Sequence, residues 1–135
     1  MRLSANKPCP CSSGRKAKGC CLPLLKGAAA TSPEALMRSR FTAYSVGASQ
    51  YIMDTTHPDG PHWNENHQSW KQDIDLFCSV THFEQLAVLE AKDDQVFFHA
   101  ILSREGEDCS FAERSTFAHH KQRWCYLSGK PEPIP

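Results

Sequence analysis

Four cysteines near the amino terminus are the residues with the clearest capacity for chemistry. They lie within thirteen residues at the spacing C-x-C-x8-C-C, and no apolar side chain larger than alanine or proline lies between the outer two. Such a segment cannot fold around its own core, so another interaction must hold the thiols together. Four thiolates complete a tetrahedral structural site for Zn²⁺, and metal binding supplies folding free energy to short segments. The predicted zinc ligands are Cys9, Cys11, Cys20 and Cys21.

Disulfide bonds and scattered free thiols are the alternative states of these cysteines. Adjacent cysteines such as Cys20 and Cys21 pair with each other only at high strain. The start of the chain has no apolar signal-peptide core, and Leu22–Ala30 is too short and too interrupted to span a membrane. The sequence therefore indicates a zinc site, no transmembrane segment and a cytoplasmic location, where thiols stay reduced.

The first 26 residues, which we call the cysteine module, are strongly basic. They contain six basic residues and no acidic one, although the formal net charge of the whole chain is zero. Arg15, Lys16 and Lys18 lie between the cysteine pairs, where positive charge favours thiolates. These three residues are the expected contacts of an anionic partner, a protein with an acidic surface or alternatively nucleic acid or anionic lipid headgroups. The other interpretation is a solvated basic surface that only balances the thiolate charge.

The cysteine spacing resembles the SEC-C motif, a zinc module found at the carboxyl end of the SecA translocation ATPase and in many bacterial proteins. Its usual form is CPC-x-SG-x3-K-x-C followed by Cys or His. Ser12 departs from this form, because glycine is common at that position. The resemblance implies a small zinc knuckle over residues 1–26. The matching residues are Cys9, Pro10, Cys11, Ser13, Gly14, Lys18, Cys20 and Cys21.

Helices are predicted in the first half of the chain after this module. Residues 22–31 contain proline, glycine and three alanines and are predicted to form a linker. Ser32-Pro33-Glu34 is a typical helix start, with a capping serine, proline at the first helical position and an acid in the first turn. Apolar residues then recur at helical spacing up to Ala48. Two further helices are expected over Ser49–Thr55 and Asn64–Asp75, separated by a proline-rich turn.

From Ser79 the pattern changes to strands separated by short turns. Val96–Leu102 is the strongest of them, because it is rich in β-branched and aromatic residues. Helices followed by hairpin-linked strands predict an α+β domain, with helices packed on one face of an antiparallel sheet. The predicted strands are Val80–Phe83, Gln85–Glu90, Val96–Leu102, Cys109–Ala118 and Gln122–Leu127, and His119-His120-Lys121 is predicted to be the last turn.

The body of the chain resembles the YchJ family of uncharacterised bacterial proteins, in which a SEC-C module lies beside a nuclear-transport-factor-2-like domain. This resemblance implies a cystatin-like cone, a curved antiparallel sheet wrapped by helices, over residues 32–130. It also implies a cone-shaped interior. The matching segments are Met37–Tyr44, Thr55–Pro58, Trp70, Phe111–Phe117 and Trp124–Gly129.

Several polar and aromatic residues could line such an interior. Glu113 and Arg114 alternate along one strand, so only one of them can point inward. A histidine near Glu113 could act as a general base, but Arg40 bonded to Glu113 would serve equally well as a buried structural pair. The five histidines at 57, 62, 67, 119 and 120 do not have a spacing that favours a second metal site. The pocket candidates are Arg40, Tyr44, His57, Trp70, Glu113, Arg114 and Trp124.

The sequence contains no nucleophile elbow, phosphate loop or paired carboxylates. It therefore favours a non-enzymatic, zinc-binding adaptor that docks an anionic partner through its cysteine module. The alternative function is a small-molecule binder or an enzyme that uses the cone-shaped interior, and that alternative depends partly on analogy with other proteins of the fold.

Overall fold

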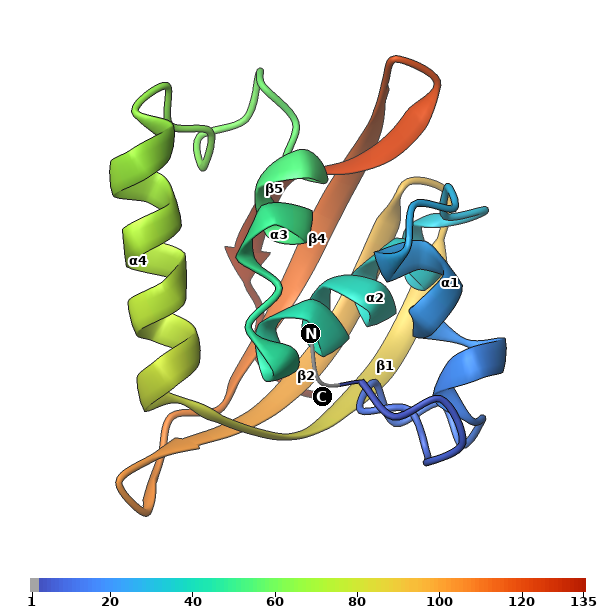
Figure 1. The fold of residues 1–135 in the computed structure, drawn as a ribbon, viewed down its shortest axis with the longest axis vertical. Coiled ribbons are helices and arrows are strands. Elements are labelled where there is room, and N and C mark those ends of the chain that lie inside the picture. The colour runs from blue at the N-terminus through green and yellow to red at the C-terminus, as the bar shows by residue number, and fades with distance from the viewer. Residues whose placement is uncertain (1–2) are drawn as a thin grey trace.

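The computed structural model describes residues 3–135, in which helices precede strands along the chain (Figure 1). Within that part of the chain, no helix combines the length and apolar character needed to cross a bilayer. The elements are η1 (Ala17–Gly19), α1 (Cys21–Leu25), α2 (Pro33–Val46), α3 (Ser49–Asp54), α4 (His67–Val80), β1 (His82–Lys92), β2 (Gln95–Arg104), β3 (Glu107–Asp108), β4 (Phe111–His120) and β5 (Arg123–Pro131).

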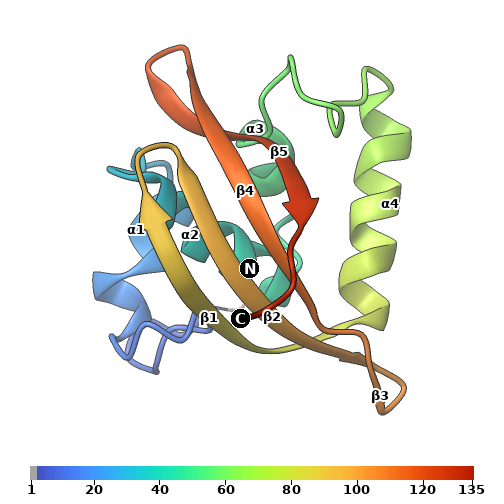
Figure 2. The same cartoon turned by 180° about the vertical axis from the view of Figure 1, so that it is seen from behind.

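The strands form one curved antiparallel sheet in the order β1-β2-β4-β5, and the short β3 pairs with β2. Register shifts occur twice along the β1–β2 pair and once between β4 and β5. Such irregularities bend a strand and increase its twist. Figures 1 and 2 show α2 and α3 on one face of the sheet and the other face free of helices. The predicted α+β class, with helices on one face of a curved sheet, is confirmed.

Helix α2 begins and ends where its sequence signals predict. The Ser32 hydroxyl accepts a hydrogen bond from the Ala35 amide, and Pro33 occupies the first helical position. Gly47 ends the helix in the left-handed conformation, at φ 73°. The buried face of α2 packs on the inner face of the sheet. The core between them contains Leu36, Met37, Phe41, Leu86, Val96, Phe98, Ala100, Leu102, Phe117 and Tyr126.

The predicted linker over residues 22–31 is partly wrong, because Cys21–Leu25 form helix α1. Leu22 is buried beside the cysteines, and Leu25 packs against the cluster that contains Ile52. Pro23 lies in the first turn of α1, where its missing N–H removes no helical hydrogen bond. Apolar burial therefore stabilises a short helix in a segment whose composition indicates a linker.

Helix α4 starts and ends later than predicted. The Asn66 side chain accepts a hydrogen bond from the Ser69 amide, which places the helix start at His67. The helix continues through Val80, across residues with strand-like composition. Its inward face carries Trp70 and Ile74 at a spacing of four residues, whereas Val80 is exposed. Packing of this face outweighs the β propensity of the last turn.

The last hairpin is tighter than the sequence predicts. His119 and His120 belong to β4 and pair with Trp124 and Arg123. Only Lys121 and Gln122 form the turn, and both have positive φ, 51° and 66°. A two-residue turn with two positive φ values matches the twist of the strands that it joins.

Gly60 provides a test of how the segment before α4 packs on the sheet. A β-carbon at this position would collide with the backbone carbonyl oxygen of Leu127 in β5. We therefore expect Gly60→Ala to lower the free energy of unfolding by about 1–3 kcal/mol, as overpacking does. Thermal unfolding measures this effect. Gly19→Ala is the matched control, because nothing lies within 4 Å of a β-carbon there. Equal melting temperatures for the two variants would contradict this packing.

Candidate metal centre and interior cavity

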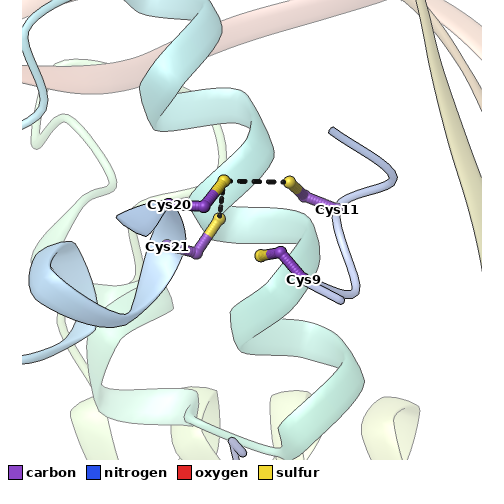
Figure 3. Close-up of side chains that lie close together, drawn as sticks. All are labelled: Cys9, Cys11, Cys20 and Cys21. Atoms are coloured by element: carbon purple, nitrogen blue, oxygen red, sulfur yellow. Dashed lines mark hydrogen bonds between the residues drawn. The ribbon is translucent and has the colours of Figure 1, made fainter. Parts of the chain in front are cut away.

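The four amino-terminal cysteines gather at one point, and their sulfurs face one another (Figure 3). All four Sγ atoms lie within 4.8 Å of one another. The Sγ of Cys20 is 3.5 Å from that of Cys11 and 3.9 Å from that of Cys21. Sulfurs bound to one tetrahedral zinc lie about 3.8 Å apart, given Zn–S bonds of ~2.3 Å. In residues 3–135 this is the sole group of three or more His, Cys, Asp or Glu side chains placed to hold a metal ion.

Local backbone hydrogen bonds bring the two cysteine pairs together. The Cys9 amide donates to the Arg15 carbonyl at 2.8 Å and the Ser12 amide donates to the Cys9 carbonyl at 3.2 Å, which closes a loop around the first pair. Gly14 lies within this loop at φ 86°, a conformation that favours glycine. The second pair lies at the junction of η1 and α1, where the Cys20 amide donates to the Ala17 carbonyl.

The thiols lie close enough to hydrogen-bond to one another. Hydrogen bonds from Cys11 and Cys21 lower the pKa of the Cys9 thiol, whereas hydrogen bonds to Cys11 and Cys9 raise that of Cys21. Two polar groups between the cysteine pairs contact the Cys20 sulfur. The Ser13 hydroxyl lies 3.2 Å from this sulfur, and Nη2 of Arg15 lies 3.7 Å from it. Four cysteine sulfurs at this separation are suitable ligands for a soft or borderline metal cation. Binding of such a cation would displace the thiol protons.

The cysteine module is attached to the body through contacts with α2 and β1. The Sγ of Cys9 lies 3.6 Å from the Thr42 hydroxyl, and Nη1 of Arg38 donates to the Cys11 carbonyl at 2.9 Å. At the open edge of the sheet, the Leu86 amide donates to the Ser12 hydroxyl at 3.1 Å. The loop that carries the first cysteine pair therefore has a fixed position against the body.

Ser12, the departure from the usual motif, has a structural explanation. Its φ is 67°, in the left-handed region where glycine is favoured. The serine hydroxyl accepts the hydrogen bond from Leu86 of β1, which a glycine could not do. The extra contact to the body compensates for the backbone conformation.

The basic residues between the cysteine pairs are all exposed. Arg15 reaches the Cys20 sulfur, so part of its charge faces the cluster. Lys16 and Lys18 have no carboxylate within 4.0 Å among the described residues. The two lysines consequently present unpaired positive charge to solvent.

A second feature is a cavity of about 260 Å³ between the helices and the inner face of the sheet. Four of the seven predicted pocket residues line it, namely Arg40, Tyr44, Trp70 and Glu113. Burial raises the pKa of Tyr44 and of Tyr126, so both phenols remain protonated at neutral pH. The full lining is Met37, Arg40, Phe41, Tyr44, Ile52, Thr56, His62, Trp70, Phe77, Phe83, Phe98, Ala100, Leu102, Phe111, Glu113 and Tyr126.

The other three predicted pocket residues lie elsewhere. The His57 ring accepts the Asp59 amide at Nδ1, and its Nε2 lies 3.2 Å from the His119 carbonyl oxygen, so this ring stabilises the turn against β4. Trp124 packs on the His119 ring, with centroids 3.9 Å apart. Both residues therefore pack against His119, near the end of β4, and not in the cavity.

Arg114 also lies outside the cavity, because strand alternation turns Glu113 inward and Arg114 outward. On the outer face, the Arg114 guanidinium bonds to Glu90 and Glu132 and lies over the Phe97 ring. These contacts satisfy its charge on the side of the sheet that faces away from the cavity.

The suggested pair of Arg40 with Glu113 does not form. No carboxylate lies within 4.0 Å of Arg40 in the described residues, and both Arg40 and Glu113 contact Tyr126 instead. The Arg40 guanidinium is 4.8 Å from the Tyr126 ring centroid, while the Tyr126 hydroxyl donates to Glu113 at 3.1 Å. Sequence reasoning misses Tyr126, although its even spacing from Trp124 is a signal that two aromatic residues share one strand face.

Comparisons with known proteins agree with this architecture. Residues 32–129 match the family model described as "YchJ, middle NTF2-like domain". The chain is also similar to a UPF0225 protein of Deinococcus radiodurans, at 37% identity over 123 residues, 90% of this chain and 87% of the relative. A UPF0225 protein of Sodalis glossinidius is 33% identical over 132 residues, covering 91% of this chain and 82% of that protein.

Two solved structures are similar over almost the whole chain. The solution structure of a SEC-C motif containing protein from Rhodopseudomonas palustris has a TM-score of 0.77 and 34% identity, covering 94% of this chain and 100% of that one. The crystal structure of a SEC-C motif containing protein from Psychrobacter arcticus has a TM-score of 0.73 and covers 100% of this chain and 88% of that one. At 20% identity, the second likeness shows the fold alone.

Proposed function

Since the chain belongs to the YchJ family, we propose that it is a non-enzymatic adaptor, which holds one Zn²⁺ in its cysteine module and docks an anionic partner through that module. The observation that carries this proposal is the location of Lys16 and Lys18, exposed and unpaired on the loop that joins the two cysteine pairs. A metal ion would fix this loop, and with it the direction in which the positive charges point.

Zinc is the metal that the donor set fits best. Four thiols within 4.8 Å of one another supply a complete sulfur shell and leave no donor position for water. That arrangement is typical of structural rather than catalytic zinc. Cys9, Cys11, Cys20 and Cys21 would hold the ion, and its role would be to stabilise the loop. A reducing compartment such as the cytoplasm would keep these thiols available.

A protein with an acidic surface is the partner that the charge distribution favours. The module contains six basic residues and no acidic one. Four thiolates bound to Zn²⁺ would carry a net negative charge equal to that of two thiolates, so the module as a whole would remain positive. Exposed charges of this kind raise association rates and make binding depend on salt. Nucleic acid and anionic lipid headgroups share the required charge and are the competing partners.

Removing the positive charge from the loop should weaken partner binding. We expect the triple variant Arg15→Ala, Lys16→Ala, Lys18→Ala to lose roughly tenfold in affinity, since exposed charge pairs contribute about 0.2–1 kcal/mol each. Partners recovered from cell extract on the zinc-loaded protein would be quantified at low and high salt. Nuclease-treated extract and vesicles with anionic lipid would separate a protein partner from the competing ones.

The control variant carries Lys92→Ala, Lys121→Ala and Lys130→Ala, which remove three exposed charges from the body instead. A double variant of Lys16 and Lys18 alone leaves the Arg15 contact with Cys20 in place. Zinc content must be equal in all of them. If the wild type and the triple variant recover the same partners at both salt concentrations, the basic loop is only a counter-charge for the thiolates and the adaptor proposal is wrong.

A further inference from the structure

We propose that the cavity between α2 and the sheet binds a small, neutral aromatic molecule, whose polar head offers a hydrogen-bond acceptor to Arg40 and a donor to Glu113, as a carboxamide does. The proposal is independent of the cysteine module and its partner. It depends on three features of the cavity, which are its aromatic wall, its buried cation and its carboxylate.

The wall is made of aromatic rings that surround a space instead of filling it. Tyr44 stacks on Phe83 with centroids 5.9 Å apart, and Phe77 meets both rings edge to face at 5.6 and 5.7 Å. A space of about 260 Å³ is several times the ~30 Å³ that a water molecule occupies in the liquid. Protein interiors seldom leave voids larger than one water. His62 and Phe111 both line the cavity and are exposed, so the cavity reaches solvent.

The cation is the Arg40 guanidinium, which is buried at 5% exposure. Its Nη1 donates to the Ile52 carbonyl and to the hydroxyls of Thr55 and Thr56, which are all neutral acceptors. These bonds fix the guanidinium in place without balancing its charge. A buried charge is costly unless it is paired. Because Arg40 also lines the cavity, an acceptor on a bound molecule can reach the remaining donors of the guanidinium.

The carboxylate belongs to Glu113, on the opposite wall. Its Oε2 accepts hydrogen bonds from the Ser115 hydroxyl at 2.6 Å and from the Tyr126 hydroxyl at 3.1 Å. No basic side chain of residues 3–135 lies within 4.0 Å of it. Gly129 is opposite Ser115 in the β4–β5 pair, and the Glu113 side chain lies against it, so a β-carbon at Gly129 would collide with the carboxylate. Two hydrogen bonds therefore hold Oε2 of Glu113 in place, and its Oε1 is free to accept a hydrogen bond from a ligand.

The separation of these two charges determines the kind of ligand. Arg40 and Glu113 both contact Tyr126, the guanidinium over the ring and the carboxylate at the hydroxyl, but no ion pair joins them in the described residues. A ligand whose polar head is only a carboxylate would give Glu113 no hydrogen-bond donor. A ligand whose polar head is only an amine would give Arg40 no hydrogen-bond acceptor. A neutral head with both an acceptor and a donor matches both groups. Aromatic walls with a few convergent polar groups are the usual construction of small-molecule sites.

The test uses four simple probes that differ only in the polar head, added to the full-length, metal-loaded protein. Benzamide offers acceptor and donor, benzoate an acceptor, benzylamine a donor, and toluene neither. Amide chemical shifts would be followed by NMR during titration. We expect benzamide to give saturable shifts at cavity residues such as Phe98 and Ala100, with a Kd on the order of millimolar for a ligand of this size. The other three should bind at least about threefold more weakly.

The variant Glu113→Gln keeps the size of the side chain and an acceptor for Ser115 and Tyr126, but removes the charge. It should weaken benzamide binding by roughly three- to tenfold, because hydrogen bonds to charged groups are the stronger ones. Glu90→Gln on the outer face is the matched control and should bind as the wild type does. No saturable shift with benzamide, equal binding of toluene and benzamide, or equal binding by wild type and Glu113→Gln would each overturn the proposal.

Discussion

Replacing Cys11 with serine is expected to abolish stoichiometric zinc binding and to unfold most of the cysteine module. Cys11 is completely buried at 0% exposure, and its sulfur lies 3.5 Å from that of Cys20 within the cluster. A serine hydroxyl does not deprotonate at neutral pH and is a poor ligand where soft thiolates are required. The buried residues around the cluster are few, namely Cys9, Ala17, Cys21 and Leu22. They cannot replace the folding free energy that a structural metal supplies.

Elemental analysis of protein purified without chelator measures this effect, with one zinc per wild-type chain expected and less than about a tenth of that in the variant. Cys78→Ser is the matched control. Cys78 lies outside the cluster in α4, and burial raises the pKa of its thiol to about 11, so it remains protonated at neutral pH. Metal-free wild-type protein with a well-ordered module, or full zinc content in the Cys11 variant, would contradict the proposed site.

The cluster of four cysteines is the part of this protein that sequence reasoning predicts best, because its signal is local. Spacing alone brings the four cysteines within reach of one another, and the hydrogen bonds that close the loop lie within residues 9–20. The start of α2 is predictable for the same reason, since the Ser32 cap and Pro33 act over one helical turn. Local chemistry determines both features, and the structure has them where the sequence indicates.

The cavity is less predictable because distant elements build it. Arg40 and Glu113 line the same space, but the contact of each with Tyr126 depends on the pairing of β4 with β5 and on the register shift there. The inward direction of Glu113 rather than Arg114 likewise depends on which face of β4 the helices cover. Strand alternation shows that one of the two points inward, but not which one.

Ser12 illustrates how a departure from a motif can report a contact. Glycine is favoured at φ 67°, so a serine there has a conformational cost that a side-chain contact can offset. That interaction is the hydrogen bond from Leu86, which lies 74 residues away in the sequence. The sequence shows the departure, but only the fold supplies the partner.

Deleting the cysteine module should leave a body that folds but is less stable. We expect residues 27–135 to unfold cooperatively, because the core between α2 and the sheet contains no residue of the module. The deletion removes the hydrogen bonds of Cys9, Cys11 and Ser12 to the body, at about 1 kcal/mol each. It also removes the packing of Leu25 against the cluster around Ile52. Together these losses should lower the free energy of unfolding by about 2–4 kcal/mol.

Thermal unfolding followed by circular dichroism measures the loss, with a fall in melting temperature of roughly 4 °C for each kcal/mol in a domain of this size. The full-length Cys11→Ser variant is the necessary comparison, because it loses the metal but keeps residues 1–26. Since the three contacts require an ordered loop, this variant should be destabilised nearly as much as the deletion. A deletion with no cooperative transition would show that the module and body form one folding unit. A deletion as stable as the wild type would show that the observed contacts contribute nothing to the stability of the body.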